Sequence, residues 1–191
     1  MLELIYPNDP APLVRGAGRA SASEMLPIVD ENGMVKAQAS RAYCHSGSKV
    51  LHPVVHLHIV NREGKIYIQQ RSASKDLLPL KWDTAVGGHI SYGEWVLEAL
   101  FREASEELHF HDFHPIWITS YVFESKVEKE LVNVFATVGD FHPVPDGEEV
   151  AAGRYWSPEE IEAKMGKGVF TPNFEREYQT ILKPYLNQTH S

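Results

Sequence analysis

The chain is poor in the features that mark secreted and membrane-bound proteins. It has one cysteine, Cys44, among 191 residues, so no disulfide can form within the chain and a reducing compartment is expected. No apolar run approaches the roughly 20 residues of a membrane span. The N-terminal residues lack both the basic start and the apolar core of a signal peptide. These absences predict a cytoplasmic protein without a membrane partner.

Basic residues are also scarce. The 18 lysines and arginines are outnumbered by 26 aspartates and glutamates, which gives a formal net charge of −8. Such a chain has no electrostatic attraction for nucleic acid or for an anionic membrane, so neither is expected as a partner. A small anionic substrate would need local cations or a bound metal ion. With 43% hydrophobic and 23% charged residues, the composition is typical of a soluble globular protein with one core.

The order of elements along the chain predicts one domain preceded by an arm. Residues 1–25 contain three prolines and then a run of glycine, alanine, serine and arginine, which indicates little helix or strand. This arm could contact a second subunit, so we expect a homodimer. Residues 26–191 alternate strands and helices irregularly, which favours an α+β fold. The expected strands are 26–38 (a hairpin turning at Asn32-Gly33), 50–61, 65–70, 115–123, 131–138 and 154–156, and helices are expected at 40–45, after Ser157 and after Thr171.

The most informative stretch is residues 88–110, which carries an acidic helix. A helix is expected from Glu94, because apolar residues recur at three- and four-residue steps at Leu97, Leu100, Phe101, Ala104 and Leu108. Glu103 and Glu107 lie one turn apart beside that stripe, and Glu106 lies on the same side. One interpretation is a solvated acidic face on which Glu98 pairs with Arg102. The other is a cage for a hard divalent cation such as Mg²⁺, which prefers carboxylate oxygens and is often shared with substrate phosphates.

The spacing within this stretch resembles the Nudix box, G-x5-E-x7-R-E-U-x-E-E-x-G-U, where U is a bulky aliphatic residue. The residues in register are Gly88, Glu94, Arg102, Glu103, Glu106 and Glu107. The chain departs from the pattern at Ala104, which is small for the first U, at His109, which replaces the last glycine, and at Phe110, which is aromatic. The resemblance to the Nudix hydrolase superfamily (MutT-like) implies an α/β/α sandwich around a mixed central β-sheet.

The same resemblance implies hydrolysis of a nucleoside diphosphate linked to another moiety. Glu103, Glu106 and Glu107 would bind Mg²⁺, with Mn²⁺ as a substitute, and Arg102 with Glu94 would orient the box. Catalysis would then involve Glu106, Glu107, Arg102 and Glu94. A proton acceptor often comes from outside the box in this family. Glu130, Glu128 and Glu124 are candidates, with Glu106 or Glu107 as alternatives.

Further residues resemble the isopentenyl-diphosphate isomerase-like branch of the family. In those isomerases, a metal is held by residues that match His45, His52, His89, Glu128 and Glu130, although such histidines can also serve packing. Arg71 and Lys75 match a pair that binds the diphosphate, and we assign Gly88 and His89 to substrate contact as well.

One departure from the isomerases decides between the two activities. Gly87 stands where they need a catalytic cysteine, and glycine cannot exchange a proton. We therefore expect a hydrolase. An isomerase, or a Nudix module that binds nucleotides without catalysis, is the alternative.

Overall fold

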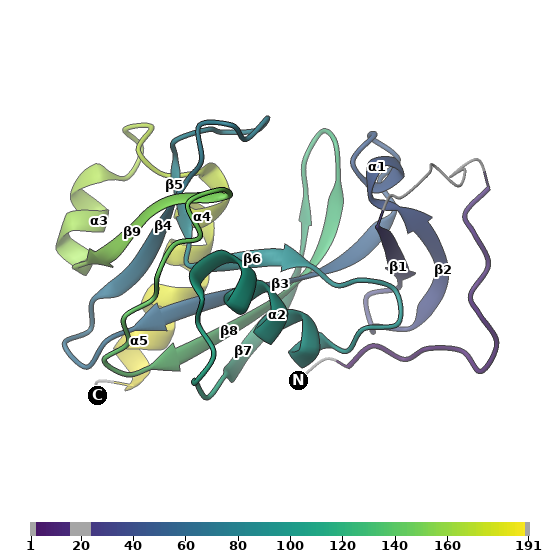
Figure 1. The fold of residues 1–191 in the computed structure, drawn as a ribbon, viewed down its shortest axis with the longest axis horizontal. Coiled ribbons are helices and arrows are strands. Elements are labelled where there is room, and N and C mark those ends of the chain that lie inside the picture. Colours follow the sequence, from purple (N-terminus) through teal and green to yellow (C-terminus); the bar gives the residue numbers. More distant parts are fainter. Residues whose placement is uncertain (1–2, 16–23, 190–191) are drawn as a thin grey trace. The chain divides into compact units, whose positions relative to one another are not determined.

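The chain folds into a mixed β-sheet with helices and a separate hairpin, as the α+β prediction required. The structure, a computed structural model, describes residues 3–15 and 24–189 (Figure 1). In chain order the elements are β1 (Met25–Val29), β2 (Val35–Ser40), α1 (Arg41–Cys44), β3 (Leu51–Val60), β4 (Ile66–Arg71), β5 (Trp82–Thr84), β6 (Val86–His89), α2 (Val96–Leu108), β7 (Ile116–Glu124), β8 (Lys129–Val138), β9 (Val150–Trp156), α3 (Pro158–Lys164), α4 (Pro172–Glu177), the π-helical segment η1 (Tyr178–Leu182) and α5 (Lys183–Thr189).

Seven strands form one sheet. β5, β4, β3, β8 and β7 follow one another in that order, while β6 also pairs with β3 and β9 also pairs with β4. β5 and β6 were not predicted, because each is short and β6 contains the Gly87-Gly88 pair, whose sequence is more typical of a turn. Along the described ranges, no helix is long and apolar enough to cross a membrane.

The chain divides into two compact units. The first consists of Met1–Val55, Gly88–Leu100 and Thr119–Val134, and the second of His56–Gly87, Phe101–Ile118 and Phe135–Ser191. Because the divisions fall within β3, β6, α2, β7 and β8, the candidate site residues are distributed over both units.

The first unit contains the predicted hairpin. β1 and β2 pair antiparallel, with Gly33 in the left-handed conformation (φ 81°) that the turn requires. Ser40 caps α1 by accepting a hydrogen bond from the Tyr43 N–H, and His45 ends this helix. The described part of the N-terminal arm pairs with the hairpin through bridges at Ile5 and Leu13. The arm is therefore held more closely than its composition indicated; its residues 16–23 lie outside the described ranges.

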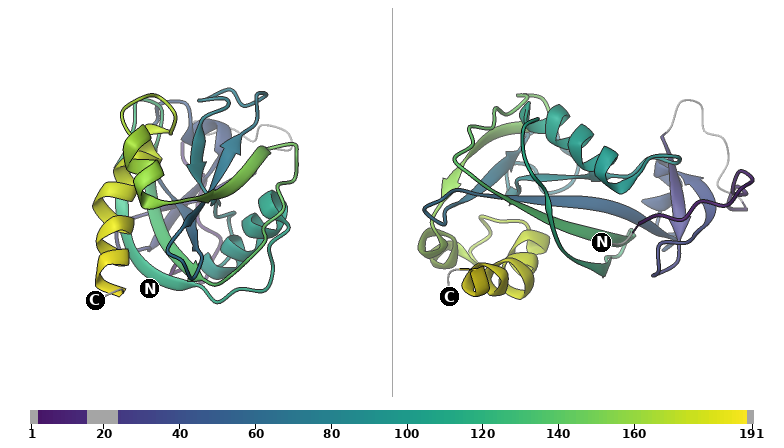
Figure 2. Two further views of the ribbon diagram at one scale, coloured as in Figure 1. Left: turned by 90° about the vertical axis from the view of Figure 1, so that its left-hand side faces the viewer. Right: turned by 90° about the horizontal axis from the view of Figure 1, so that it is seen from below.

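The second unit has its own apolar core between β4, β9 and the C-terminal helices. Figure 2 shows α4 and α5 running along one side of these strands. Ser157 forms the predicted capping box with Glu160 at the start of α3, and Thr171 caps α4. The core is formed by Val60, Ile66, Ile68, Trp156, Ile161, Phe170, Phe174, Tyr178, Leu182 and Leu186.

The helical segment predicted after Thr171 departs from regular α-helical register. Regular spacing would place Phe174, Tyr178 and Ile181 on one apolar face, but Leu182 is buried instead and Ile181 is only half-buried. The reason is η1, where the Lys183 N–H bonds to the Tyr178 carbonyl five residues earlier. Because of this wider turn, Tyr178 is followed on the core side by Leu182, four residues on, and not by Ile181, three residues on.

The acidic helix α2 starts later than predicted, at Val96 rather than at Glu94. Leu100, Ala104 and Leu108 are buried as expected, whereas Phe101 is 37% exposed, so this side chain does not belong to the core stripe. The helix ends at His109, which has a left-handed φ of 46°. Glycine is favoured in this conformation, so the structure explains why the family pattern has glycine at this position.

Candidate active site

The three box carboxylates on the last turns of α2 belong to the second unit and are buried to different extents. The side chain of Glu106 is 59% exposed and that of Glu103 is 14% exposed, whereas Glu107 as a residue is only 8% exposed. Arg102 connects the first two, because its guanidinium donates to Glu103 at 2.8 Å and to Glu106 at 3.2 Å. The structure thus gathers these four residues on the last turns of α2, as predicted from their spacing.

Glu107 is the buried member of this group. We expected its side chain beside the core stripe, but it is enclosed and accepts hydrogen bonds from the Gln69 amide at 3.0 Å and from the Gly87 N–H at 3.3 Å. Burial, and then the charge of Glu103, raise the pKa of Glu107 well above its ordinary value. Without a cation, an ionised carboxylate that is enclosed beside a second carboxylate is destabilised. A bound cation would offset both the burial and the repulsion, so Glu107 is well placed to be a metal ligand.

This donor set fits a hard divalent cation. The available donors are carboxylate oxygens on adjacent helical turns, and Mg²⁺ and Mn²⁺ prefer oxygen ligands of this kind. Arg102 and Gln69 act as supporting residues because they orient the carboxylates by hydrogen bonds. Gln69, on β4, could not be predicted, because nothing in its local sequence indicates that it contacts Glu107.

Glu94, in the first unit, holds a loop rather than a helical turn. Its carboxylate accepts a hydrogen bond from the Ser91 N–H at 3.0 Å, and its own N–H donates to the Ser91 carbonyl at 3.0 Å. The first turn of α2 is instead closed by Glu98, which accepts from the Trp95 N–H at 2.8 Å. Gly88, the first residue of the box, is half-buried within β6.

The two predicted phosphate-binding cations both have partners in the second unit. The Arg71 guanidinium donates to the Leu77 carbonyl at 3.0 and 3.2 Å and lies 3.5 Å from Asp83. Lys75 pairs with Glu149 at 2.6 Å. Arg71 therefore also fixes the loop between β4 and β5. Contact of either residue with phosphate stays a prediction.

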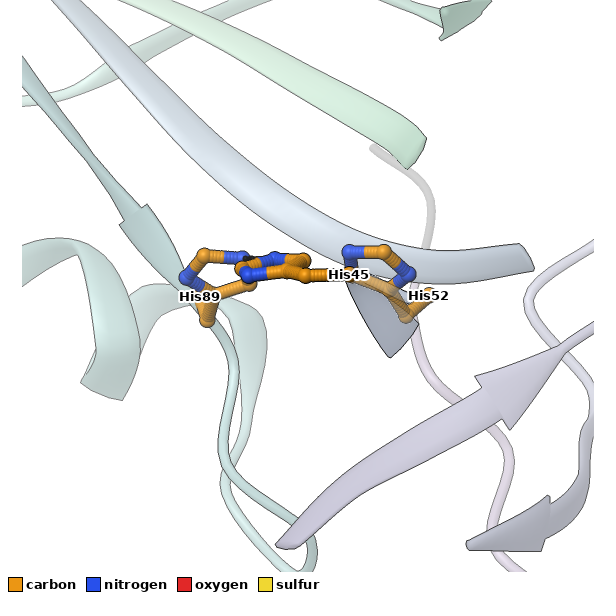
Figure 3. A group of neighbouring side chains, drawn as sticks. All are labelled: His45, His52 and His89. Atoms are coloured by element: carbon orange, nitrogen blue, oxygen red, sulfur yellow. Dashed lines mark hydrogen bonds between the residues drawn. The ribbon is translucent and has the colours of Figure 1, made fainter. Parts of the chain in front are cut away.

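A second cluster lies in the first unit, where three histidines converge (Figure 3). His45 at the end of α1, His52 on β3 and His89 on β6 each offer one ring nitrogen within 4.8 Å of the other two. The Nε2 atoms of His45 and His89 are 3.0 Å apart. These are the histidines that the isomerase resemblance implied as metal ligands, so residues far apart in sequence do come together.

Two carboxylates complete this cluster. Glu128 lies 3.2 Å from His45 Nε2, and Glu130 lies 4.0 Å from both His52 and His89. His52 is fully buried, and its Nε2 is enclosed without a hydrogen-bond partner. Burial lowers the pKa of His52 to about 4, so its ring is neutral near pH 7 and able to bind a metal. This mixed set of imidazoles and carboxylates fits a transition metal better than Mg²⁺.

Sequence reasoning missed a third polar cluster, which is buried in the second unit. Glu177 at the end of α4 is 1% exposed, and its two oxygens lie 2.9 Å from His56 Nδ1 and 2.7 Å from His58 Nε2. The available signal was the pair of histidines two residues apart on β3, which must face the same side of the sheet. Their partner is more than a hundred residues away, so the pairing itself gave no local signal.

The fold and the acidic helix are those of a pyrophosphohydrolase, a class of enzyme that generally uses divalent metal ions. The model of the NUDIX domain matches residues 50–174, and the chain belongs to this family. The match includes every residue of the box and excludes the N-terminal arm. The predictions of a Nudix enzyme and of an α+β fold are therefore confirmed.

Similar proteins agree with this assignment. An uncharacterized Nudix hydrolase of Nostoc sp. is 30% identical over 151 residues, which are 76% of this chain and 87% of the relative. The isopentenyl-diphosphate delta-isomerase 1 of Photorhabdus laumondii is 27% identical over 173 residues, which are 86% of this chain and 98% of the isomerase. The crystal structure of DR0079 from Deinococcus radiodurans superposes with a TM-score of 0.71 at 26% identity, covering 82% of this chain and 98% of that one.

Proposed function

We propose that this Nudix enzyme is a Mg²⁺-dependent hydrolase that cleaves a diphosphate linkage in a nucleoside diphosphate joined to another moiety, or in a related organic diphosphate. The observation that carries the proposal is the enclosed Glu107 carboxylate beside Glu103 on α2. A bound divalent cation would offset the free-energy cost of burying this charge and would reduce the repulsion between the two carboxylates. Mn²⁺ accepts the same oxygen ligands and is expected to replace Mg²⁺.

The residues of the box have distinct roles in this proposal. Glu103, Glu106 and Glu107 would hold the ion, which when bound neutralises phosphate charge and lowers the pKa of a water molecule. Arg102 restrains Glu103 and Glu106 through its guanidinium, so their carboxylates keep one orientation before the substrate arrives. Glu94 holds the loop that precedes α2. Little covalent chemistry is required of the protein in phosphoryl transfer, because positioning and charge neutralisation dominate.

Substrate contact is assigned to Arg71, Lys75, Gly88 and His89. Arg71 offers a bidentate fork to a phosphate group, whereas Lys75 offers a point charge. Glu149, which pairs with Lys75, is an exposed side chain that a diphosphate could displace. This exchange of one anionic partner for another gives binding without a large excess of positive charge, as the acidic composition requires.

Glu130 is our candidate for the proton acceptor in hydrolysis. Its carboxylate would accept the proton of the attacking water at Oε1 or Oε2. The 4.0 Å distances from Glu130 to His52 and His89 give it a second role to test, as a ligand of a transition metal held with those histidines. A Glu130→Gln variant separates the two roles, because only the second predicts loss of the transition metal as well as loss of turnover.

A second candidate activity is the isomerisation of isopentenyl diphosphate. It is favoured by the histidine–carboxylate cluster and by the similarity to the Photorhabdus isomerase. Gly87 opposes it, because it leaves the position of the catalytic cysteine without a proton-exchanging group. Cys44 does not replace that group, since it is buried and burial raises the pKa of its thiol to about 12.

The test is turnover of the purified protein on a panel of nucleoside diphosphates, nucleotide sugars, dinucleoside polyphosphates and isopentenyl diphosphate. Each compound is incubated with Mg²⁺, Mn²⁺ or EDTA, and products are separated by anion-exchange chromatography. Cleavage of one class that EDTA abolishes supports the proposal and identifies the second moiety. Conversion of isopentenyl diphosphate to its allylic isomer, without cleavage of any compound, would establish the isomerase instead.

A further inference from the structure

The N-terminal arm precedes the residues matched by the family model, yet it reaches the loop of the candidate active site within the first unit. Two backbone contacts anchor it to the hairpin. Ile5 forms hydrogen bonds of 2.9 Å with the Gly33 carbonyl and with the Val35 N–H, and the Val14 N–H donates to the Gln38 carbonyl at 2.9 Å. Leu4, next to the first anchor, and Ala11, between the two, are both buried. The arm is thus built into the first unit as an additional edge of the hairpin.

Tyr6 extends from this arm to the backbone of Gly93 and Glu94. The Tyr6 hydroxyl accepts a hydrogen bond from the Gly93 N–H at 2.9 Å and donates to the Glu94 carbonyl at 3.2 Å. Its ring packs edge-on against Tyr92 and Trp95, with centroid distances of 5.4 and 6.2 Å. Burial raises the pKa of Tyr6 to about 12, so its hydroxyl keeps the proton that it donates near pH 7.

The backbone that Tyr6 contacts forms a turn around a left-handed glycine. Gly93 is in the left-handed conformation (φ 89°), with open space where a Cβ would be. The Ser91–Glu94 turn is closed by the two hydrogen bonds that Glu94 makes with Ser91. The Tyr6 hydroxyl adds one bond on each side of the Gly93–Glu94 peptide. It therefore restricts the direction in which the Glu94 side chain leaves the backbone.

We propose that Tyr6 is a positioning residue for Glu94, so that the N-terminal arm is a working part of the active site. The inference rests on the proposed function, in which Glu94 orients the box. Tyr6 acts through Glu94 and is not assigned any contact with substrate. Small displacements of orienting groups reduce turnover without weakening ground-state binding, so Tyr6→Phe should lower kcat by about tenfold and leave KM unchanged.

The chain offers a matched control at Tyr92. Its hydroxyl accepts a hydrogen bond from the Ala11 N–H at 2.8 Å, so Tyr92→Phe also removes one hydroxyl between the arm and the loop. Tyr92→Phe leaves the bonds of Tyr6 to Gly93 and Glu94 in place. We expect the two variants to lose similar thermal stability, whereas kcat falls only in Tyr6→Phe. Equal loss of kcat in both variants would overturn the inference, because arm attachment in general would then explain the effect.

A double-mutant cycle tests whether Tyr6 acts through Glu94. Turnover and KM are measured for Tyr6→Phe, Glu94→Gln and the double variant, on the substrate that the panel identifies. The expected result is that Tyr6→Phe has no further effect on kcat once Glu94 is replaced. Multiplication of the two single effects would overturn the inference, as would a wild-type kcat in Tyr6→Phe.

A readout independent of turnover completes the test. Amide hydrogen exchange of Gly93, followed by NMR, should accelerate at least several-fold in Tyr6→Phe and remain unchanged in Tyr92→Phe. Unchanged exchange in Tyr6→Phe would remove the structural basis of the inference. Absence of any metal-dependent turnover in the wild-type protein would instead refute the proposed function. A failure at Tyr6 alone would leave that function standing.

Discussion

Replacement of Glu177 by glutamine should destabilise the protein severely, although Glu177 has no assigned part in catalysis. Its carboxylate is 1% exposed and accepts from His56 at 2.9 Å and from His58 at 2.7 Å. A carboxamide can accept at only one of its two ends, so one buried histidine N–H would face another donor. Breaking a buried pair in this way costs about 3–5 kcal/mol. For a chain of this size that corresponds to a fall in Tm of roughly 10 °C.

The contribution of Glu177 to stability should depend on pH in one direction. Burial alone would raise the pKa of Glu177, but the charge of His56 and the hydrogen bonds from both histidines outweigh it and hold the pKa well below its ordinary value. A carboxyl group with a depressed folded-state pKa stabilises the protein above its unfolded pKa, which is about 4.3. The stabilisation is lost progressively as pH falls below that value. The difference between wild type and Glu177→Gln should therefore be full at pH 7 and smaller at pH 3.

Urea denaturation followed by tryptophan fluorescence measures this difference, because Trp82 and Trp156 lie in the same unit. Glu175→Gln is the matched control, since Glu175 lies on the same helix, is half-buried and accepts one hydrogen bond, from the Gly166 N–H at 2.9 Å. We expect the control to lose about 1 kcal/mol or less. Equal losses in the two variants, or a difference that does not shrink with acid, would refute the assignment of a buried ion pair.

The remaining predictions concern the site and the end of α2. Glu107→Gln should lower turnover by about a thousandfold, while urea denaturation in EDTA shows no loss of stability because a buried charge is removed; substantial activity would exclude Glu107 as a metal ligand. Arg71→Ala should raise KM for diphosphates roughly tenfold, and an unchanged KM would mean that Arg71 only holds its loop. His52→Gln should reduce the zinc or manganese that elemental analysis finds in the dialysed protein. Equal metal contents in the variant and the wild type would show that the histidines serve packing alone. His109→Gly should raise Tm by about 2 °C, because the left-handed φ of 46° disfavours histidine, and a lower Tm would show that the imidazole makes a compensating contact.

Much of the fold was predictable because its signals are local. The apolar stretches within 50–61 and 65–70 identified β3 and β4, the Asn32-Gly33 turn identified the hairpin, and Ser157 marked the start of α3. β5 and β6 were missed because strands of three and four residues carry too little pattern, and paired glycines normally indicate a turn. The start of α2 was expected too early, at Glu94, because a loop residue can fall on the helical period by chance.

The candidate site was predictable only as far as spacing along one element reaches. The offsets among Glu103, Glu106 and Glu107 require a shared helical face, so their clustering followed from helix geometry. The enclosure of Glu107 depends on Gln69, which comes from another element, and no local pattern encodes that contact. His45, His52 and His89 lie on three separate elements, so their spacing in the sequence could not predict that they converge. Only the resemblance to the isomerases implied it.

The most direct test of the central proposal is the Mg²⁺ dependence of turnover in wild type and Glu107→Gln, measured in parallel on the substrate that the panel identifies. Glu159→Gln is the charge-matched control, since Glu159 is exposed on α3. We expect saturable Mg²⁺ activation in wild type and in Glu159→Gln. In Glu107→Gln, turnover should stay near background at every Mg²⁺ concentration. Equal Mg²⁺ activation in all three proteins would refute the proposal, because the enclosed carboxylate would then have no part in binding the ion that drives hydrolysis.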